Sequence, residues 1–277
     1  MAPVVKTPAR DHQGRWRGYL GTTIPMHRAL RHLRLGSFFW VQLLLLPCIA
    51  SAAQVWAWPV VRQYWQDQFL FWSQKVGVTG QVALRASGIP WMGDIPSPYM
   101  NAGLPSTSQW WVGLFIVAAL LLVSLRLPDA LLPVRYLLRF VAFIQASAQL
   151  YFFFFAASYP YESATYLSDV VEQSALLWFF LPWFLALVYL VLMQSAWHYL
   201  LLVALSAAYL VLLTPFQYTL HAWVLAQGSL LAHPALYLLG TLMLQIVALI
   251  GLYSWAVTWH GPSDAGRYAA SRPFTRS

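Results

Sequence analysis

The chain has 277 residues, of which 60% are hydrophobic, 17% are aromatic and only 9% are charged, and its mean hydropathy is +0.59. A soluble domain carries charge on about a quarter of its residues. There are too few charged side chains here to cover a water-facing surface of this size, which excludes a large soluble domain and predicts an integral membrane protein. The net charge of +8 does not indicate nucleic-acid binding, because the basic residues flank apolar segments and are not interleaved with aromatics on one surface.

The first 36 residues are basic and irregular, and we expect them to form a cytoplasmic tail. The apolar segment 38–58 that follows is predicted to be the first membrane span. Within it, the stretch Ala50–Ala53 looks like the small-residue cleavage site of a signal peptide. However, the apolar run exceeds the usual length of about 7–15 residues for a signal-peptide core, so we favour a retained signal-anchor.

Residues 59–109 are predicted to form an outer loop between the first and second spans. Its first part, 60–76, has one aromatic face at helical spacing, which is typical of an amphipathic helix lying in the headgroup region. Its second part, 88–105, is rich in proline and glycine and predicts a turn-rich loop. We expect the aromatic residues of this segment to contact lipid or a partner protein, the candidate contact residues being Trp65, Trp72, Trp91 and Tyr99.

Five further apolar segments complete the predicted membrane domain. A helix of about 20 residues crosses a hydrocarbon core of about 30 Å. The segments, in chain order, are 110–125, 137–157, 173–193, 197–213 and 235–259. The fold predicted is therefore an all-α polytopic membrane protein with six transmembrane helices over residues 37–259 and a cytoplasmic tail at 260–277.

Two connecting segments have distinctive compositions. Residues 158–172 form an acidic elbow that carries Glu162, Asp169 and Glu172 and has no Lys or Arg. Residues 214–234 carry no charged side chain, and we expect a short helix there that lies in the interface or re-enters the membrane.

The distribution of Lys and Arg predicts the orientation of the spans. With six spans and both termini in the cytoplasm, thirteen of the sixteen basic residues lie on the inner side and three lie in one outer loop. Basic residues are enriched in cytoplasmic loops. This bias predicts that the N and C termini lie in the cytoplasm, and we expect the membrane to be the bacterial cytoplasmic (inner) membrane.

Polar residues in or beside apolar spans are the candidate site residues. Gln145 and Gln149 are four residues apart and share one helical face, where they could line a substrate path or bond between helices. Glu172 abuts the fourth span and could face the bundle interior, where a carboxylate is a functional candidate by default. His221 and His233 are weak metal candidates, because two histidines twelve residues apart have no carboxylate at ligand spacing.

No sequence pattern identifies a catalytic residue. The chain has no GxSxG, HExxH or P-loop motif, and its single cysteine, Cys48, lies within the first apolar span and is expected to be a packed core residue. We therefore expect no cofactor and no nucleic-acid partner, and an enzyme is the less favoured class.

Three function hypotheses remain open at the level of sequence. The first is a non-catalytic subunit or assembly factor of an envelope complex, with other membrane or periplasmic proteins as partners. The second is the permease subunit of a transporter, driven in one version by a separate ATPase, which rests on the span layout alone. The third is a membrane enzyme or a haem or metal anchor that uses Glu172 and the outer histidines.

The predicted orientation can be tested with a reporter fused after Ser277. We expect the reporter to remain cytoplasmic, since the basic residues of the tail favour the inner side, and the protein to resist extraction from membranes by alkali. The measurement is the activity of an export-dependent and an export-sensitive reporter at the same position. An exported reporter, or release of the protein by alkali, would contradict the topology.

Overall fold

The computed structural model describes residues 37–78, 81–190 and 195–259. The predicted cytoplasmic tails, 1–36 and 260–277, lie outside the described residues. By its internal contacts the chain divides into two units, Met1–Trp40 and Val41–Ser277. Of the first unit only residues 37–40 are described, and they begin a helix that continues into the second unit; all contacts discussed below lie within the second.

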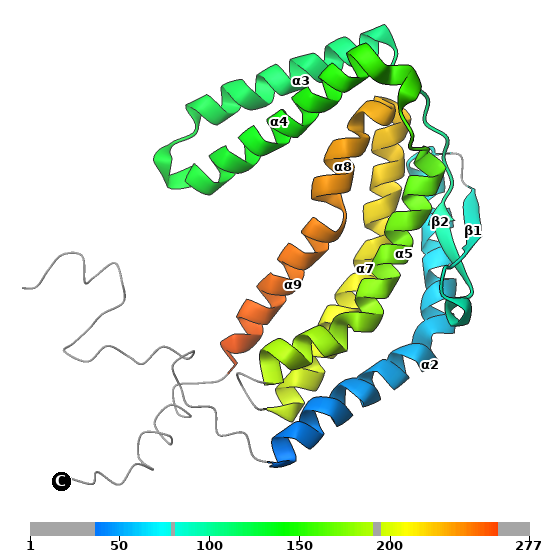
Figure 1. Cartoon of the computed structure of the whole chain (residues 1–277), viewed down its shortest axis with the longest axis vertical. Coiled ribbons are helices and arrows are strands. Elements are labelled where there is room, and N and C mark those ends of the chain that lie inside the picture. The colour runs from blue at the N-terminus through cyan, green and yellow to red at the C-terminus, as the bar shows by residue number, and fades with distance from the viewer. Residues whose placement is uncertain (1–36, 79–80, 191–194, 260–277) are drawn as a thin grey trace, which may run out of the picture. The chain divides into compact units, whose positions relative to one another are not determined.

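The chain contains six helical segments that are long and apolar enough to cross a membrane, which confirms the predicted all-α polytopic bundle. A short π-helical turn, Ala186–Leu190, extends the fourth segment, and the sixth consists of two helices in succession (Figure 1). The helices are α2 (Ser37–Lys75), α3 (Thr107–Arg126), α4 (Leu132–Phe155), α5 (Ser163–Leu185), α7 (Ala196–Gly228), α8 (His233–Gly240) and α9 (Leu242–Val257).

A two-stranded antiparallel hairpin, β1 (Val82–Ala86) and β2 (Asp94–Pro98), lies between α2 and α3. The prolines and glycines of residues 88–105 predicted a turn-rich loop, and in the structure this part contains β2. Pro96 and Pro98 are compatible with the hairpin because they occupy positions whose N–H groups would point away from β1. A short 3-10 turn, Pro90–Met92, connects the strands.

Two helices that were predicted to be separate are continuations of spanning helices. The separate interfacial helix expected at 60–76 is the continuation of α2, because Trp58, Val61, Trp65 and Phe69 extend one buried face past Pro59. By the same token, the short helix expected within 214–234 is mostly the end of α7, whose buried stripe runs on to Leu225.

The acidic elbow is also shorter than expected. Helix α5 begins at Ser163, so that Asp169 and Glu172 lie on its second and third turns rather than in a loop. Cys48, expected to be packed, is exposed on α2.

Helices α5 and α7 form the centre of the described structure. They lie side by side in Figure 1, and both carry long stripes of fully buried side chains. Helices α3 and α4 pack together as an antiparallel pair, and α4 alone of the two also contacts α8 extensively. Most large exposed apolar side chains lie on α2, α3, α4 and α9, which is expected where the surrounding solvent is lipid.

Two prolines inside helices leave backbone carbonyls without their helical partner, and side chains of α2 satisfy both. Pro182 cannot donate to the carbonyl of Trp178, which instead accepts a hydrogen bond from Gln54 Nε2 at 2.8 Å. Pro215 likewise cannot donate to the carbonyl of Val211, which accepts from Trp65 Nε1 at 3.0 Å. An unsatisfied carbonyl is costly in a membrane, so these two bonds tie α2 to α5 and α7.

We expect replacement of Trp65 by phenylalanine to destabilise the protein by about 1 kcal/mol, since the ring is retained but the N–H donor to the Val211 carbonyl is lost. In a Pro215→Ala background the new alanine N–H can bond that carbonyl, and the cost of Trp65→Phe should fall. The measurement is a double-mutant cycle on the unfolding free energy of the full chain in mixed detergent micelles. Equal costs in the two backgrounds would contradict the assignment.

Candidate functional site

The hairpin is fastened to α5 by the acidic residues that the sequence analysis placed in a loop. Arg85 Nη1 of β1 donates to Asp169 Oδ1 at 2.6 Å and to Ser168 Oγ at 2.8 Å. One turn further along, Glu172 Oε1 accepts from Ser87 Oγ at 2.7 Å and from the backbone N–H of Gly88 at 2.9 Å. Both carboxylates of this face therefore position the hairpin.

The two ends of the hairpin are held as well. At the tip, Trp58 Nε1 of α2 donates to the carbonyl of Met92 at 2.8 Å, and Gly93 has a φ of +65°. A side chain at Gly93 would also meet the guanidinium of Arg62, so this turn requires glycine. After β2, the Ser163 hydroxyl donates to the Met100 carbonyl at 3.0 Å and accepts from the Ala102 N–H at 2.7 Å.

The outer edge of β1 has open, unpaired backbone groups, whereas prolines interrupt the outer edge of β2. The Tyr99 N–H donates to the Gln81 carbonyl and the Ser87 N–H donates to the Gly93 carbonyl, and in an antiparallel pair such bonded positions alternate. The N–H and C=O groups of Val82, Leu84 and Ala86 therefore point away from β2. On β2 the corresponding outward positions include Pro96 and Pro98, which have no N–H, and both are buried.

The open edge of β1 is accessible. Leu84 and Ala86 are exposed, with 56% of the Leu84 surface accessible, and no described residue pairs with their backbone N–H groups. A short strand with unpaired N–H and C=O groups is a template for another extended chain.

The four aromatic residues predicted to contact a partner fall into two groups. Trp65 is wholly buried between helices, and Trp72 is half-buried with its ring 5.5 Å from that of Phe216 on α7. Trp65 is therefore not part of an outer surface, because α2 continues and buries this face against α7. Trp91, in the turn between the strands, and Tyr99, directly after β2, are exposed.

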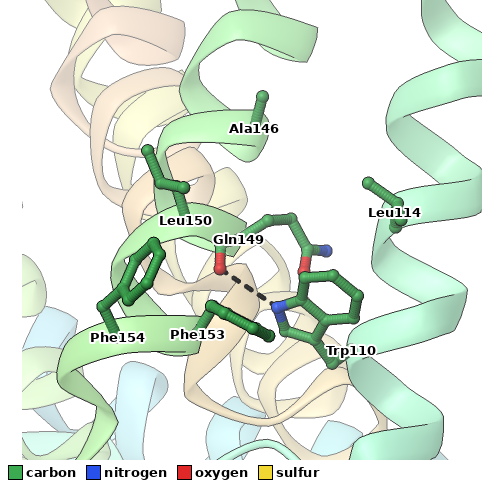
Figure 2. A pocket seen from close by; sticks show the side chains of 7 residues that line it. All are labelled: Trp110, Leu114, Ala146, Gln149, Leu150, Phe153 and Phe154. Carbon is green, nitrogen blue, oxygen red and sulfur yellow. Dashed lines mark hydrogen bonds between the residues drawn. The ribbon is translucent and has the colours of Figure 1, made fainter.

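The amides of α4 contact neighbouring helices. Gln145 Nε2 donates to the Leu231 carbonyl at 3.1 Å. Gln149 is buried against Gly113 of α3, where an added Cβ would lie 1.9 Å from Gln149 Nε2. Figure 2 shows Trp110 of α3 donating to the Gln149 backbone carbonyl, at 3.0 Å, beside a small apolar pocket of about 290 Å³. The side chain of Gln145 therefore bonds between helices, whereas the amide nitrogen and oxygen of Gln149 are buried with no hydrogen-bond partner among the described residues.

The two candidate histidines lie on either side of Tyr166. His221 Nδ1 shares a hydrogen bond with the Tyr166 hydroxyl at 3.0 Å, and its Nε2 faces Gly240. His233 Nδ1 shares a short hydrogen bond with the Tyr159 hydroxyl, and its ring lies 4.3 Å from that of Tyr166. Among the described residues no group of three or more His, Cys, Asp or Glu side chains could hold a metal ion.

Tyr159 lies in the connection between α4 and α5. Burial, reinforced by the neighbouring Tyr161 and Tyr151, raises the pKa of the Tyr159 hydroxyl well above its usual range. It therefore stays protonated at physiological pH and remains available for the hydrogen bond to His233.

A buried polar network lies where α9 meets α5 and α7, and the sequence analysis missed it. Gln245 Nε2 donates to Ser174 Oγ at 2.8 Å and to Gln217 Oε1 at 3.3 Å, and the Tyr218 hydroxyl lies 2.6 Å from Ser174 Oγ. Gln217 Nε2 in turn donates to the Gly240 carbonyl, at the break between α8 and α9. The signal was present, since Gln217 and Gln245 are amides in apolar segments, as Gln145 and Gln149 are.

Comparisons with protein-family models, with curated proteins and with solved structures gave no match to this chain.

We expect Glu172→Leu to loosen the hairpin, because the Ser87 hydroxyl and the Gly88 N–H lose their common acceptor, at a cost of about 1 kcal/mol. Asp169→Asn should have a smaller effect, since the Arg85–Asp169 pair is about half exposed and such pairs contribute about 0–1 kcal/mol. Hydrogen–deuterium exchange of peptides covering 81–99 measures both. Unchanged exchange in Glu172→Leu would refute a positioning role for this carboxylate.

Proposed function

We propose that this chain is a non-catalytic integral subunit or assembly factor of an envelope complex, and that it holds a partner by strand addition to β1. In this proposal the protein resides in the bacterial cytoplasmic (inner) membrane with both termini in the cytoplasm. The hairpin then lies on the outer side, where membrane or periplasmic subunits can reach it. The observation that carries the proposal is a rigidly held hairpin with one open edge.

The way the hairpin is held supports a docking role. Hydrogen bonds from α2 and α5 hold the hairpin and the segment that follows β2 at several points. An incoming strand therefore meets a preformed template, and the cost of ordering it is reduced. Nothing of the β1–β2 pairing has to change on binding, since the outward groups of Val82, Leu84 and Ala86 take no part in it.

Exposed apolar side chains on and beside the hairpin also suit a protein partner. Leu84 of β1, Trp91 of the turn and Tyr99 after β2 are exposed. Aromatic residues are enriched in protein interfaces. In strand addition the main chain supplies affinity, while such neighbouring side chains supply specificity.

A permease subunit is the second candidate, and a different observation favours it. The sixth segment breaks at Gly240–Thr241, and the freed Gly240 carbonyl is bonded by Gln217 within the buried network. Broken helices with polar groups near the membrane midplane are a feature of secondary transporters. If a separate ATPase drives transport, it would bind the basic connector between α3 and α4, which includes Arg126 and Arg135.

The test is photo-crosslinking in cells from position 86, with the full chain. We expect one discrete adduct with another envelope protein, identified by mass spectrometry. Leu84→Pro should reduce its yield about tenfold, since it removes an outward N–H and puts a ring in the path of the added strand. Leu84→Thr keeps the N–H and is the matched control, expected to retain the adduct.

Two further readouts decide the outcome. Amide exchange at residues 84 and 86 should slow in the purified complex, as strand pairing requires. An adduct that persists in Leu84→Pro, or a complex without this protection, would refute strand addition. Crosslinks to an ATPase from the connector at 127–131, with none from position 86, would instead favour the permease.

A further inference from the structure

A large pocket lies between α4, the 159–162 connection, α5 and α8. Its volume is about 980 Å³, which is at the upper end of the range for small-molecule sites. It is separate from the open edge of β1, and the inference drawn from it does not depend on the proposed function.

One end of the pocket is aromatic and acidic. Five tyrosines line it, together with the carboxylates of Glu162 and Asp169, and no Lys or Arg does so. Asp169 is paired with Arg85, which reaches it from the hairpin. Glu162 makes no ion pair with any described residue, so the pocket keeps an uncompensated negative charge. The five tyrosines are Tyr151, Tyr159, Tyr161, Tyr166 and Tyr237.

The tyrosine rings are held in a fixed arrangement around His233. Tyr161 stacks on the imidazole with centroids 5.5 Å apart, Tyr166 meets it edge to face at 4.3 Å, and Tyr237 lies 6.1 Å away. Ring faces attract a cation within about 6 Å, most strongly where water is excluded. His233 is 5% exposed, and its Nε2 has no hydrogen-bond partner among the described residues.

The other end of the pocket is apolar and opens toward lipid. It is lined by Phe143 and Ile144 of α4 and by Leu238 of α8. Phe143 is 70% exposed and Leu238 is 48% exposed, so this end lies at the surface of two spanning helices. These apolar side chains can contact a hydrocarbon chain at the surface of α4 and α8.

We propose that this pocket binds an amphiphile with an ammonium head group and a hydrocarbon tail. The positive head lies against Glu162 and the ring of Tyr161, and the tail lies along Phe143 and Leu238. The Glu162 carboxylate disfavours anionic head groups through like-charge repulsion.

The experiment is calorimetric titration of the full chain in neutral maltoside micelles with dodecylammonium, against a micelle-only blank. We expect saturable binding at one site. Tetramethylammonium, which has the charge without the tail, and dodecanol, which has the tail without the charge, should each bind at least about tenfold more weakly, because each lacks one of the two contributions.

Variants separate the head-group contacts. Glu162→Gln should weaken dodecylammonium binding about tenfold through loss of the charge, whereas Asp94→Asn, an exposed acid on the hairpin outside the pocket, should leave it unchanged. Tyr161→Leu should weaken binding severalfold, and Tyr161→Phe, which keeps the ring face, should not. Circular dichroism and gel filtration verify that each variant is folded.

Three outcomes would overturn the proposal. The first is non-saturating uptake equal to the micelle blank. The second is equal weakening by Glu162→Gln and Asp94→Asn, which would indicate non-specific attraction to surface charge. The third is binding of dodecanol as tight as that of dodecylammonium, which would indicate a purely apolar groove.

Discussion

The carbonyl oxygens of Trp178 and Val211 impose the constraint on which the described bundle depends. Each is freed by a proline four residues later, and neither can be left unpaired in a membrane. Gln54 and Trp65 satisfy them from α2, so the first helix is fastened to the two central ones at two levels.

Helix α5 connects the two sites proposed for this protein. Ser168, Asp169 and Glu172 hold the hairpin, while Tyr166 and Asp169 also line the large pocket. Asp169 belongs to both, since its partner Arg85 comes from β1. A change at the hairpin thus has a direct electrostatic route to the pocket, through the one carboxylate they share.

The candidate residues show which tertiary contacts a local sequence pattern does not predict. Glu172 was a candidate because it abuts a span. Its carboxylate accepts hydrogen bonds from the hairpin and does not face the bundle interior. Trp65 was predicted to lie on an outer surface. The helical spacing of aromatic residues identifies a common face, but it does not show whether protein or lipid contacts that face. Gln217 and Gln245 were passed over although they carry the same signal as Gln145 and Gln149, and only their convergence with Ser174 and Tyr218 distinguishes them.

The sequence by itself determined that this is a polytopic membrane protein with six apolar helices, because helix length and lack of charge are local properties matched to the thickness of a bilayer. Only the tertiary structure decided that prolines at 96 and 98 belong to a strand, that α2 supplies donors to other helices, and that tyrosines from three segments surround His233. These depend on contacts between residues far apart in the chain, which no local pattern encodes.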